Sequence, residues 1–193
     1  MKRGRPGIGR SKLLAAAKDL LWEGGYEAMS PGSVLERSGV GQGSLYHHFD
    51  GKLALALAAL SEIVAEEKAA VDGVFARDKS PYRRIADYLG RERQALRGCR
   101  VGRLANETIM ETPEFRAGIA DYLGHVEARL AEAVRDGQLQ GSFSAAVDPD
   151  AAGALFLSVI EGGYVLARAH WDPMRMRRAL DGAEALLTAI VIT

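Results

Sequence analysis

The chain has 193 residues, of which 48% are apolar, and this is enough for the core of one large domain or two small ones. It has no run of 18 apolar residues and no apolar segment behind its basic N-terminus, so we expect neither a transmembrane helix nor a signal peptide. It has a single cysteine, Cys99, so we expect no internal disulfide and a cytoplasmic protein. The charges balance at 25 basic against 25 acidic residues, yet residues 1–52 hold eight basic and five acidic ones. This bias is consistent with a nucleic-acid-binding N-terminus, and from charge alone a solvated basic tail explains it equally well.

Prolines mark the starts of helices along the chain. Five of the six prolines directly follow Ser, Thr or Asp, the residue types that cap helix N-termini, and proline itself is well tolerated at the first helical position. The sequence shows no strand alternation with hairpin turns, so we predict an all-α fold of about nine helices. The five marked starts are Ser30-Pro31, Ser80-Pro81, Thr112-Pro113, Asp148-Pro149 and Asp172-Pro173.

The first three helices are predicted over about residues 11–23, 31–38 and 42–48. Gly39 suits the left-handed position that ends the second of them, and a short glycine-containing turn then leads to the third. Two helices joined in this way form the helix-turn-helix motif, whose second helix enters the DNA major groove. We therefore predict a DNA-binding domain over residues 1–52.

The remaining chain, residues 53–193, is predicted to be a second helical domain. Its last two helices, over about 149–170 and 173–192, are apolar around most of their circumference and must be covered. We predict that a second copy of the chain covers them in a two-fold, four-helix interface; a hairpin buried in its own domain is the alternative. The preceding helices are predicted over about residues 52–75, from Pro81 to Gly98, over 99–110, and from Pro113 to Gly137.

The N-terminal part contains several short motifs at a characteristic spacing. These are Gly24-Gly25-Tyr26, Ser30, residues 34–40, the run Gly43-Ser44-Leu45-Tyr46-His47-His48-Phe49, and Lys52. Over about residues 10–60 the chain resembles the N-terminal domain of TetR-family transcriptional regulators. Two positions depart from that family: Gly41 stands where Ser or Thr is common, and Pro31-Gly32 replace a Thr and a polar residue.

The resemblance implies a function for both domains. It implies a three-helix helix-turn-helix domain followed by a helical domain that binds a ligand and dimerises. We therefore expect a homodimeric repressor that binds a palindromic DNA operator and is released by a small-molecule inducer. Activation in place of repression is the alternative.

The side chains at the helix starts and on the third helix are candidates for DNA contacts. Helix N-termini suit phosphate, whereas Gln, Ser and His can each bond base edges in the major groove. Gly43 has no side chain, which lets the helix lie close to the groove. Packing against the protein is the alternative for Tyr46, and we favour it, or the phosphate edge, for His48. The phosphate candidates are Ser30, Ser33, Tyr46 and Lys52, and the base-edge candidates are Gln42, Ser44 and His47.

The basic arm at the N-terminus contains Arg3 and Arg5 around Gly4. Arginines on an extended segment can enter a narrow minor groove of A·T-rich DNA. The alternative is a disordered tail that adds only nonspecific positive charge.

Residues that face inward from the middle helices are candidates for the ligand pocket. Such pockets are mostly apolar or aromatic with a few polar groups. Most of the Phe and Leu candidates are expected to be ordinary core residues, and each polar candidate is equally consistent with a structural role. Polar candidates are Asn106, Glu107, His125 and Glu161. The pocket candidates are Tyr88, Leu89, Cys99, Leu104, Phe115, Ile119, Tyr122, Phe156, Ile160 and Tyr164.

Cys99 suggests a second kind of trigger. It follows Gly98 at a predicted helix N-terminus, with Arg97, Arg100 and Arg103 nearby in sequence, and both features lower the pKa of a thiol. An electrophile- or oxidant-sensing repressor is therefore the alternative to reversible ligand binding. A small, buried, unreactive side chain is the ordinary interpretation of a lone cysteine.

An enzyme is the least supported class. The sequence has no glycine-rich phosphate loop, no His-Glu-x-x-His, no cysteine pair and no Gly-x-Ser-x-Gly. His47 and His48 are adjacent and diverge on a helix, so they form no metal site. We therefore predict no catalytic residue, no metal, no cofactor and no membrane partner.

Overall fold

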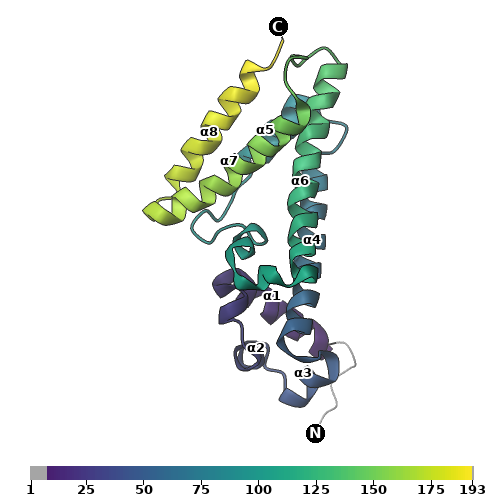
Figure 1. Ribbon diagram of the computed structural model, residues 1–193, viewed down its shortest axis with the longest axis vertical. Coiled ribbons are helices and arrows are strands. Elements are labelled where there is room, and N and C mark those ends of the chain that lie inside the picture. The colour runs from purple at the N-terminus through teal and green to yellow at the C-terminus, as the bar shows by residue number, and fades with distance from the viewer. Residues whose placement is uncertain (1–7, 193) are drawn as a thin grey trace. The chain divides into compact units, whose positions relative to one another are not determined.

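The computed structural model describes residues 8–192 and is all α-helical, as predicted (Figure 1). Arg3 and Arg5 lie outside the described residues, and their role stays a prediction. Within the described residues the one β feature is an isolated antiparallel bridge between Phe143 and Val191. The helices are α1 (Ile8–Ala28), α2 (Pro31–Ser38), α3 (Gln42–His48), α4 (Gly51–Val74), α5 (Pro81–Gly90), α6 (Pro113–Leu139), α7 (Pro149–His170) and α8 (Met174–Ala189), with two 3₁₀ helices, η1 (Gly102–Asn106) and η2 (Thr108–Glu111).

The described part thus has eight α-helices, and the expected helix over 99–110 is wrong. Gly98 has a φ of 91°, which a right-handed helix does not allow. The segment between Gly98 and α6 contains only the two short 3₁₀ helices. The side chains of Arg103 and Glu107 bond to the backbone at the end of α1. These contacts fix the segment in a shape that a continuous α-helix would not provide.

The chain divides into two compact units, which are described separately. Among the described residues, unit 1 consists of residues 8–65 and 100–119, and unit 2 of residues 66–99 and 120–192. Residues 100–119, which the sequence-based division assigns to the ligand-binding domain, therefore pack in unit 1.

Unit 1 is built around the first three helices. Ser30 caps α2 in a reciprocal pair with Ser33, and Gly39, with a φ of 64°, ends it by donating its N–H to the carbonyl of Leu35. The turn then leads into α3, whose Leu45 is buried. These local signals place α2 and α3 as the sequence predicts.

The end of α1 is held by two side chains from the segment 100–119. Gly25 has a φ of 79° and a ψ of −174°, a backbone conformation that essentially only glycine adopts. The amide of Tyr26 donates to Glu107 Oε2 at 2.7 Å, and Arg103 Nη1 donates to the carbonyl of Glu23 at 3.0 Å. We call Gly25, Arg103 and Glu107 the α1 clamp.

Unit 2 contains the helix pair α7–α8, whose two members run side by side in Figure 1. Asp148 caps α7 by accepting from the amides of Asp150 and Ala151. By length and composition α7 could span a membrane, but core helices of other proteins meet the same criteria. In this structure α7 buries Phe156 and Ile160. Gly163 of α7 lets α8 approach closely, because a Cβ there would lie 3.1 Å from Met176 Cγ.

Candidate DNA-binding surface and sensor core

The short helix α3 presents one exposed face. Gln42, Gly43, Tyr46 and His47 are exposed, and Tyr46 keeps 53% of its surface. Leu45 on the opposite face is buried in unit 1. The four exposed positions follow the spacing of a helix that lies on a surface, so their side chains are available to a partner.

Ser44 and His48 lie nearer to the rest of unit 1. Ser44 is half-buried against Gly9 of α1, where an added Cβ would lie 2.8 Å from Ser44 Oγ. His48 is half-buried, and its ring centroid lies 6.4 Å from that of Phe49. Of the three base-edge candidates, Gln42 and His47 are therefore more exposed than Ser44.

The phosphate candidates surround the N-terminal ends of α2 and α4. Ser30 Oγ accepts from the amide of Ser33 at 3.0 Å and Ser33 Oγ from the amide of Ser30 at 2.9 Å, so both hydroxyls lie at the N-terminus of α2, the helix end that suits an anion. Lys52 Nζ lies 4.1 Å from the ring centroid of Tyr26. This cation–π contact orients the ammonium while leaving it partly exposed.

The centre of unit 2 holds a group of polar aromatic side chains. Tyr88 and Tyr122 are buried, and Tyr164 is half-buried. Burial raises the pKa of all three tyrosines above the ordinary value, so they are neutral hydroxyls at physiological pH. We call Tyr88, Tyr122 and Tyr164 the tyrosine cluster.

Arg93 lies against the tyrosine cluster. Its guanidinium donates to the carbonyls of Tyr88 at 2.5 Å and Leu89 at 2.9 Å and lies 5.3 Å from the Tyr88 ring centroid. Burial lowers the pKa of Arg93 below its ordinary value. The carbonyls it binds belong to the C-terminal turn of α5, so Arg93 also caps that helix.

Cys99 is buried in unit 2 and shares a hydrogen bond with Glu161. The expectation that Cys99 opens a helix is wrong, because η1 begins only at Gly102. Two of the neighbouring arginines have other partners: Arg100 lies over the Trp22 ring, and Arg103 belongs to the α1 clamp. Burial raises the pKa of Glu161 above its ordinary value, and the hydrogen bond with Cys99 opposes that shift.

The predicted pocket residues divide between the two units. Leu104, Phe115 and Ile119 are buried in unit 1, where Phe115 packs edge-to-face on Tyr26 at 5.9 Å between centroids. Among the polar candidates, Glu107 belongs to the α1 clamp and His125 Nε2 lies 2.9 Å from Asp72 Oδ1. The predicted residues that unit 2 holds are Tyr88, Leu89, Cys99, Tyr122, Phe156, Ile160 and Tyr164.

Two family models match this chain. The model of bacterial regulatory proteins of the tetR family matches residues 13–59, and that of the tetracyclin repressor-like C-terminal domain matches residues 75–183. The chain belongs to the TetR family of transcriptional regulators. The two matches cover the exposed face of α3 in one case and the tyrosine cluster in the other.

Individual relatives agree with this assignment. Transcriptional regulator AcuR of Cereibacter sphaeroides is 28% identical over 189 residues, which cover 89% of this chain and 84% of that protein. An HTH-type regulator of Lactococcus lactis is 25% identical over 130 residues, and the match spans 66% of its length and 64% of this chain. The crystal structure of regulatory protein TetR from Rhodobacter sphaeroides superimposes with a TM-score of 0.83 at 25% identity, over 96% of this chain and all of that one.

Sequence reasoning missed the α1 clamp of this TetR-family chain. Glu107 is singled out as a ligand candidate because a carboxylate stands among packed residues, whereas the structure pairs it with the Tyr26 amide. The pair Gly24-Gly25 was the available signal. Where a glycine takes an unusual backbone conformation, the helix is interrupted, and the amides that follow it need an acceptor from elsewhere in the chain. Arg93 was also missed, since it falls inside the helix predicted from Pro81 to Gly98, where an arginine is usually an ordinary surface charge.

Proposed function

We propose that this TetR-family regulator is a homodimeric repressor that binds a pseudo-palindromic operator and is released by a small molecule. The exposed face of α3, anchored by buried Leu45, carries this proposal. Gln42, Ser44 and His47 read base edges in the major groove, and Gly43 permits close approach. Residues 1–52 form the DNA-binding domain and residues 53–193 the ligand-binding and dimerisation domain.

The phosphate contacts position this helix on the duplex. Ser30 and Ser33 at the α2 N-terminus, Tyr46 on α3 and Lys52 on α4 bind backbone oxygens, and the Arg3–Arg5 arm enters the adjacent minor groove. Such contacts fix register and orientation without reading sequence. Sequence preference then rests on few side chains, which is why one recognition helix is insufficient and a two-fold dimer is required.

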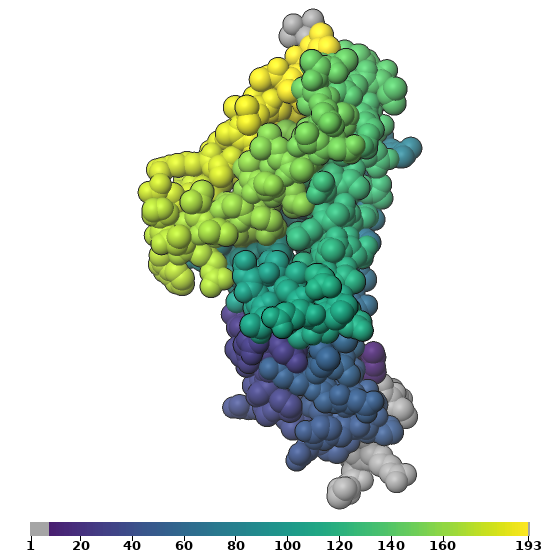
Figure 2. Space-filling model, viewed as in Figure 1, coloured from purple at the N-terminus to yellow at the C-terminus, as the bar shows by residue number. Residues whose placement is uncertain are grey.

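The apolar surface of α7 and α8 supports dimerisation. Val165 is 62% exposed and Leu166, Leu155 and Leu186 are each about half exposed, an arrangement that is costly in water. Figure 2 shows both helices on one side of unit 2. A second copy that packs these helices in a four-helix interface would remove this surface from solvent.

Changing Val165 and Leu166 together to Glu is expected to convert the dimer into monomers. Two charges per protomer would have to be buried in the interface, and operator affinity should fall with the loss of the second recognition helix. Sedimentation velocity of the full chain measures the oligomeric state. The matched control is Leu139→Glu at a residue of α6 that is 86% exposed; monomers from this control, or dimers from the double variant, contradict the proposed interface.

The ligand site is proposed at the centre of unit 2. The tyrosine cluster supplies neutral hydroxyls among the aromatic and aliphatic side chains of Phe156 and Ile160. This composition suits an aromatic or apolar molecule with one or two polar groups. Release would be a population shift, in which the ligand binds better to a conformation whose recognition helices are wrongly spaced.

The thiol of Cys99 offers a second trigger, for electrophiles or oxidants. Cys99 is buried and does not begin a helix, and both findings weaken the case for a reactive thiolate. We expect a Cys99→Ser protein to bind operator normally and to release it with the natural inducer. A Cys99→Ser protein that no longer responds, measured by fluorescence anisotropy of labelled operator, would instead support the thiol mechanism.

A further inference from the structure

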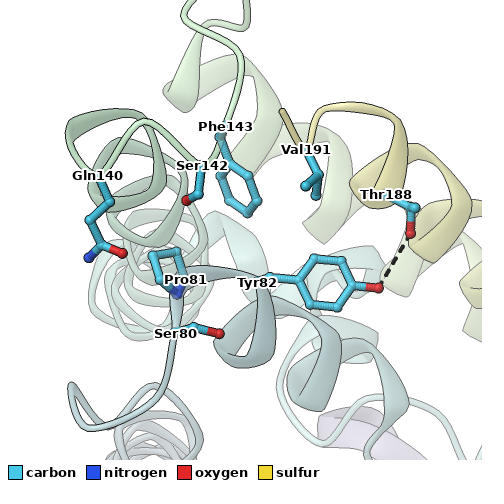
Figure 3. Close-up of a pocket in the computed structure, with 8 residues that line it drawn as sticks. All are labelled: Ser80, Pro81, Tyr82, Gln140, Ser142, Phe143, Thr188 and Val191. Carbon is cyan, nitrogen blue, oxygen red and sulfur yellow. Dashed lines mark hydrogen bonds between the residues drawn. The ribbon is translucent and has the colours of Figure 1, made fainter. Parts of the chain in front are cut away.

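We propose that unit 2 has a second small-molecule site, separate from the tyrosine cluster, for an uncharged aromatic compound that carries a hydroxyl or N–H donor. The site is a cavity of about 470 Å³ formed by the start of α5, the α6–α7 loop and the last turn of α8 (Figure 3). Its volume falls within the range of about 300–1,000 Å³ that is typical of ligand pockets.

The walls of the cavity are aromatic and apolar. Pro81 and Tyr82 lie on one side, and Phe143 and Val191 point toward them from the other (Figure 3). Phe143 is almost fully buried, so it offers a ligand a fixed edge and no open ring face, whereas the half-buried ring of Tyr82 keeps surface for contact. A flat ring system is the ligand shape that the Tyr82 ring favours.

Among the described residues, those that line the cavity carry no charged side chain, since none of them is Asp, Glu, Lys or Arg. A charged ligand would lose its hydration without gaining a counter-charge, which is costly. An uncharged compound is therefore the class that fits.

The hydroxyl groups at the cavity are arranged to accept hydrogen bonds. Thr188 Oγ1 donates to the Glu184 carbonyl at 3.0 Å, so the Tyr82 hydroxyl must donate to Thr188 Oγ1 at 3.3 Å. Ser142 Oγ likewise donates to the Gly137 carbonyl at 3.0 Å. The oxygens of Tyr82 and Ser142 retain lone pairs with no proton of their own to offer, so these two groups would bond to a donor on the ligand, whereas Ser80 and Gln140, which also line the cavity, can donate as well as accept.

The cavity also borders the short backbone pairing of the C-terminal segment. Ser144 donates its N–H to the Ile190 carbonyl at 2.8 Å, and Ile192 donates to the Ser142 carbonyl at 3.0 Å. Phe143 and Val191 form the bridge between these bonds and also line the cavity. An occupant therefore contacts both sides of the pairing and would stabilise the end of α8 by mass action.

The test uses 2-naphthol as the probe and isothermal titration calorimetry on the full chain. We expect saturable binding that Tyr82→Phe weakens about fivefold, since one hydrogen bond is lost while the ring stays. Naphthalene, which has no donor, should bind the Tyr82→Phe and parent proteins equally. Thr188→Trp, which fills the mouth of the cavity, should weaken 2-naphthol binding more than tenfold.

Both variants are first checked for an unchanged helical circular dichroism spectrum and thermal midpoint. A shift of the Val191 methyl resonances on titration, lost in Thr188→Trp, would place the probe in this cavity. The site is overturned if 2-naphthol shows no saturable binding, or if Thr188→Trp binds it as tightly as the parent protein. Neither result bears on operator binding or dimerisation, which depend on other residues.

Discussion

Replacing Gln42 and His47 together by alanine is expected to reduce the preference for operator over nonoperator DNA by about 100-fold or more. Each well-formed base contact discriminates by about 1–3 kcal/mol, and both side chains act twice in a dimer. Because the two residues are exposed and Leu45 is left in place, folding and dimerisation should not change. Fluorescence anisotropy with operator and scrambled duplexes, at one salt concentration, gives the ratio directly.

The matched control exchanges the same residue types elsewhere on the surface. Gln94 and His170 are both exposed in unit 2, and the Gln94→Ala, His170→Ala double variant should retain the parent's preference. Nonspecific affinity should also be similar in all three proteins, since phosphate contacts supply it. An operator preference that survives the loss of Gln42 and His47 would mean that another face of α3 reads the bases.

The second large effect is expected at Gly25, where alanine should lower the free energy of unfolding by about 3 kcal/mol. The Gly25 backbone lies in a region that costs other residues about 1–3 kcal/mol, and a Cβ there would overlap the Glu107 carboxylate. Glu107 would have to move, which removes its hydrogen bond from the Tyr26 amide. Urea denaturation followed by circular dichroism measures the loss.

Two other glycines separate the causes of this effect. Gly39 has a φ of 64° but open space around its Cβ position, so Gly39→Ala should cost only the backbone strain of about 1 kcal/mol. Gly41 has an ordinary φ of −69° and open space, so Gly41→Ala adds no backbone strain and should cost at most about 0.5–1 kcal/mol, because Ala is a poorer N-cap of α3 than Gly. If Gly25→Ala is no more destabilising than Gly39→Ala, the α1 clamp does not hold the end of α1.

The sequence predicted the elements that depend on local signals. The Ser-Pro pair at Ser30 and the Asp-Pro pair at Asp148 both start helices in the structure, and Gly39 ends α2 in the left-handed conformation. These features involve residues within one turn of each other, where capping geometry is decided by residue type. The exposed and buried faces of α3 follow from the same local periodicity.

The segment 99–111 was mispredicted because long-range contacts decide its shape. Arg103 and Glu107 are bonded to residues about 80 positions earlier in the chain, and no local pattern encodes those partners. The cavity beside Tyr82 was not predicted for the same reason, since it joins Tyr82, Ser142 and Thr188 from three distant segments. Its lining residues look individually like ordinary loop and helix-end positions.

The central claim is that two copies of α3 read a two-fold symmetric DNA site. The most direct measurement is a hydroxyl-radical footprint of the full chain on a genomic fragment that it selects from a mixture. We predict two symmetry-related protected half-sites whose centres are one helical turn, or a multiple of it, apart. A single asymmetric footprint, or protection with no sequence preference, would contradict the claim.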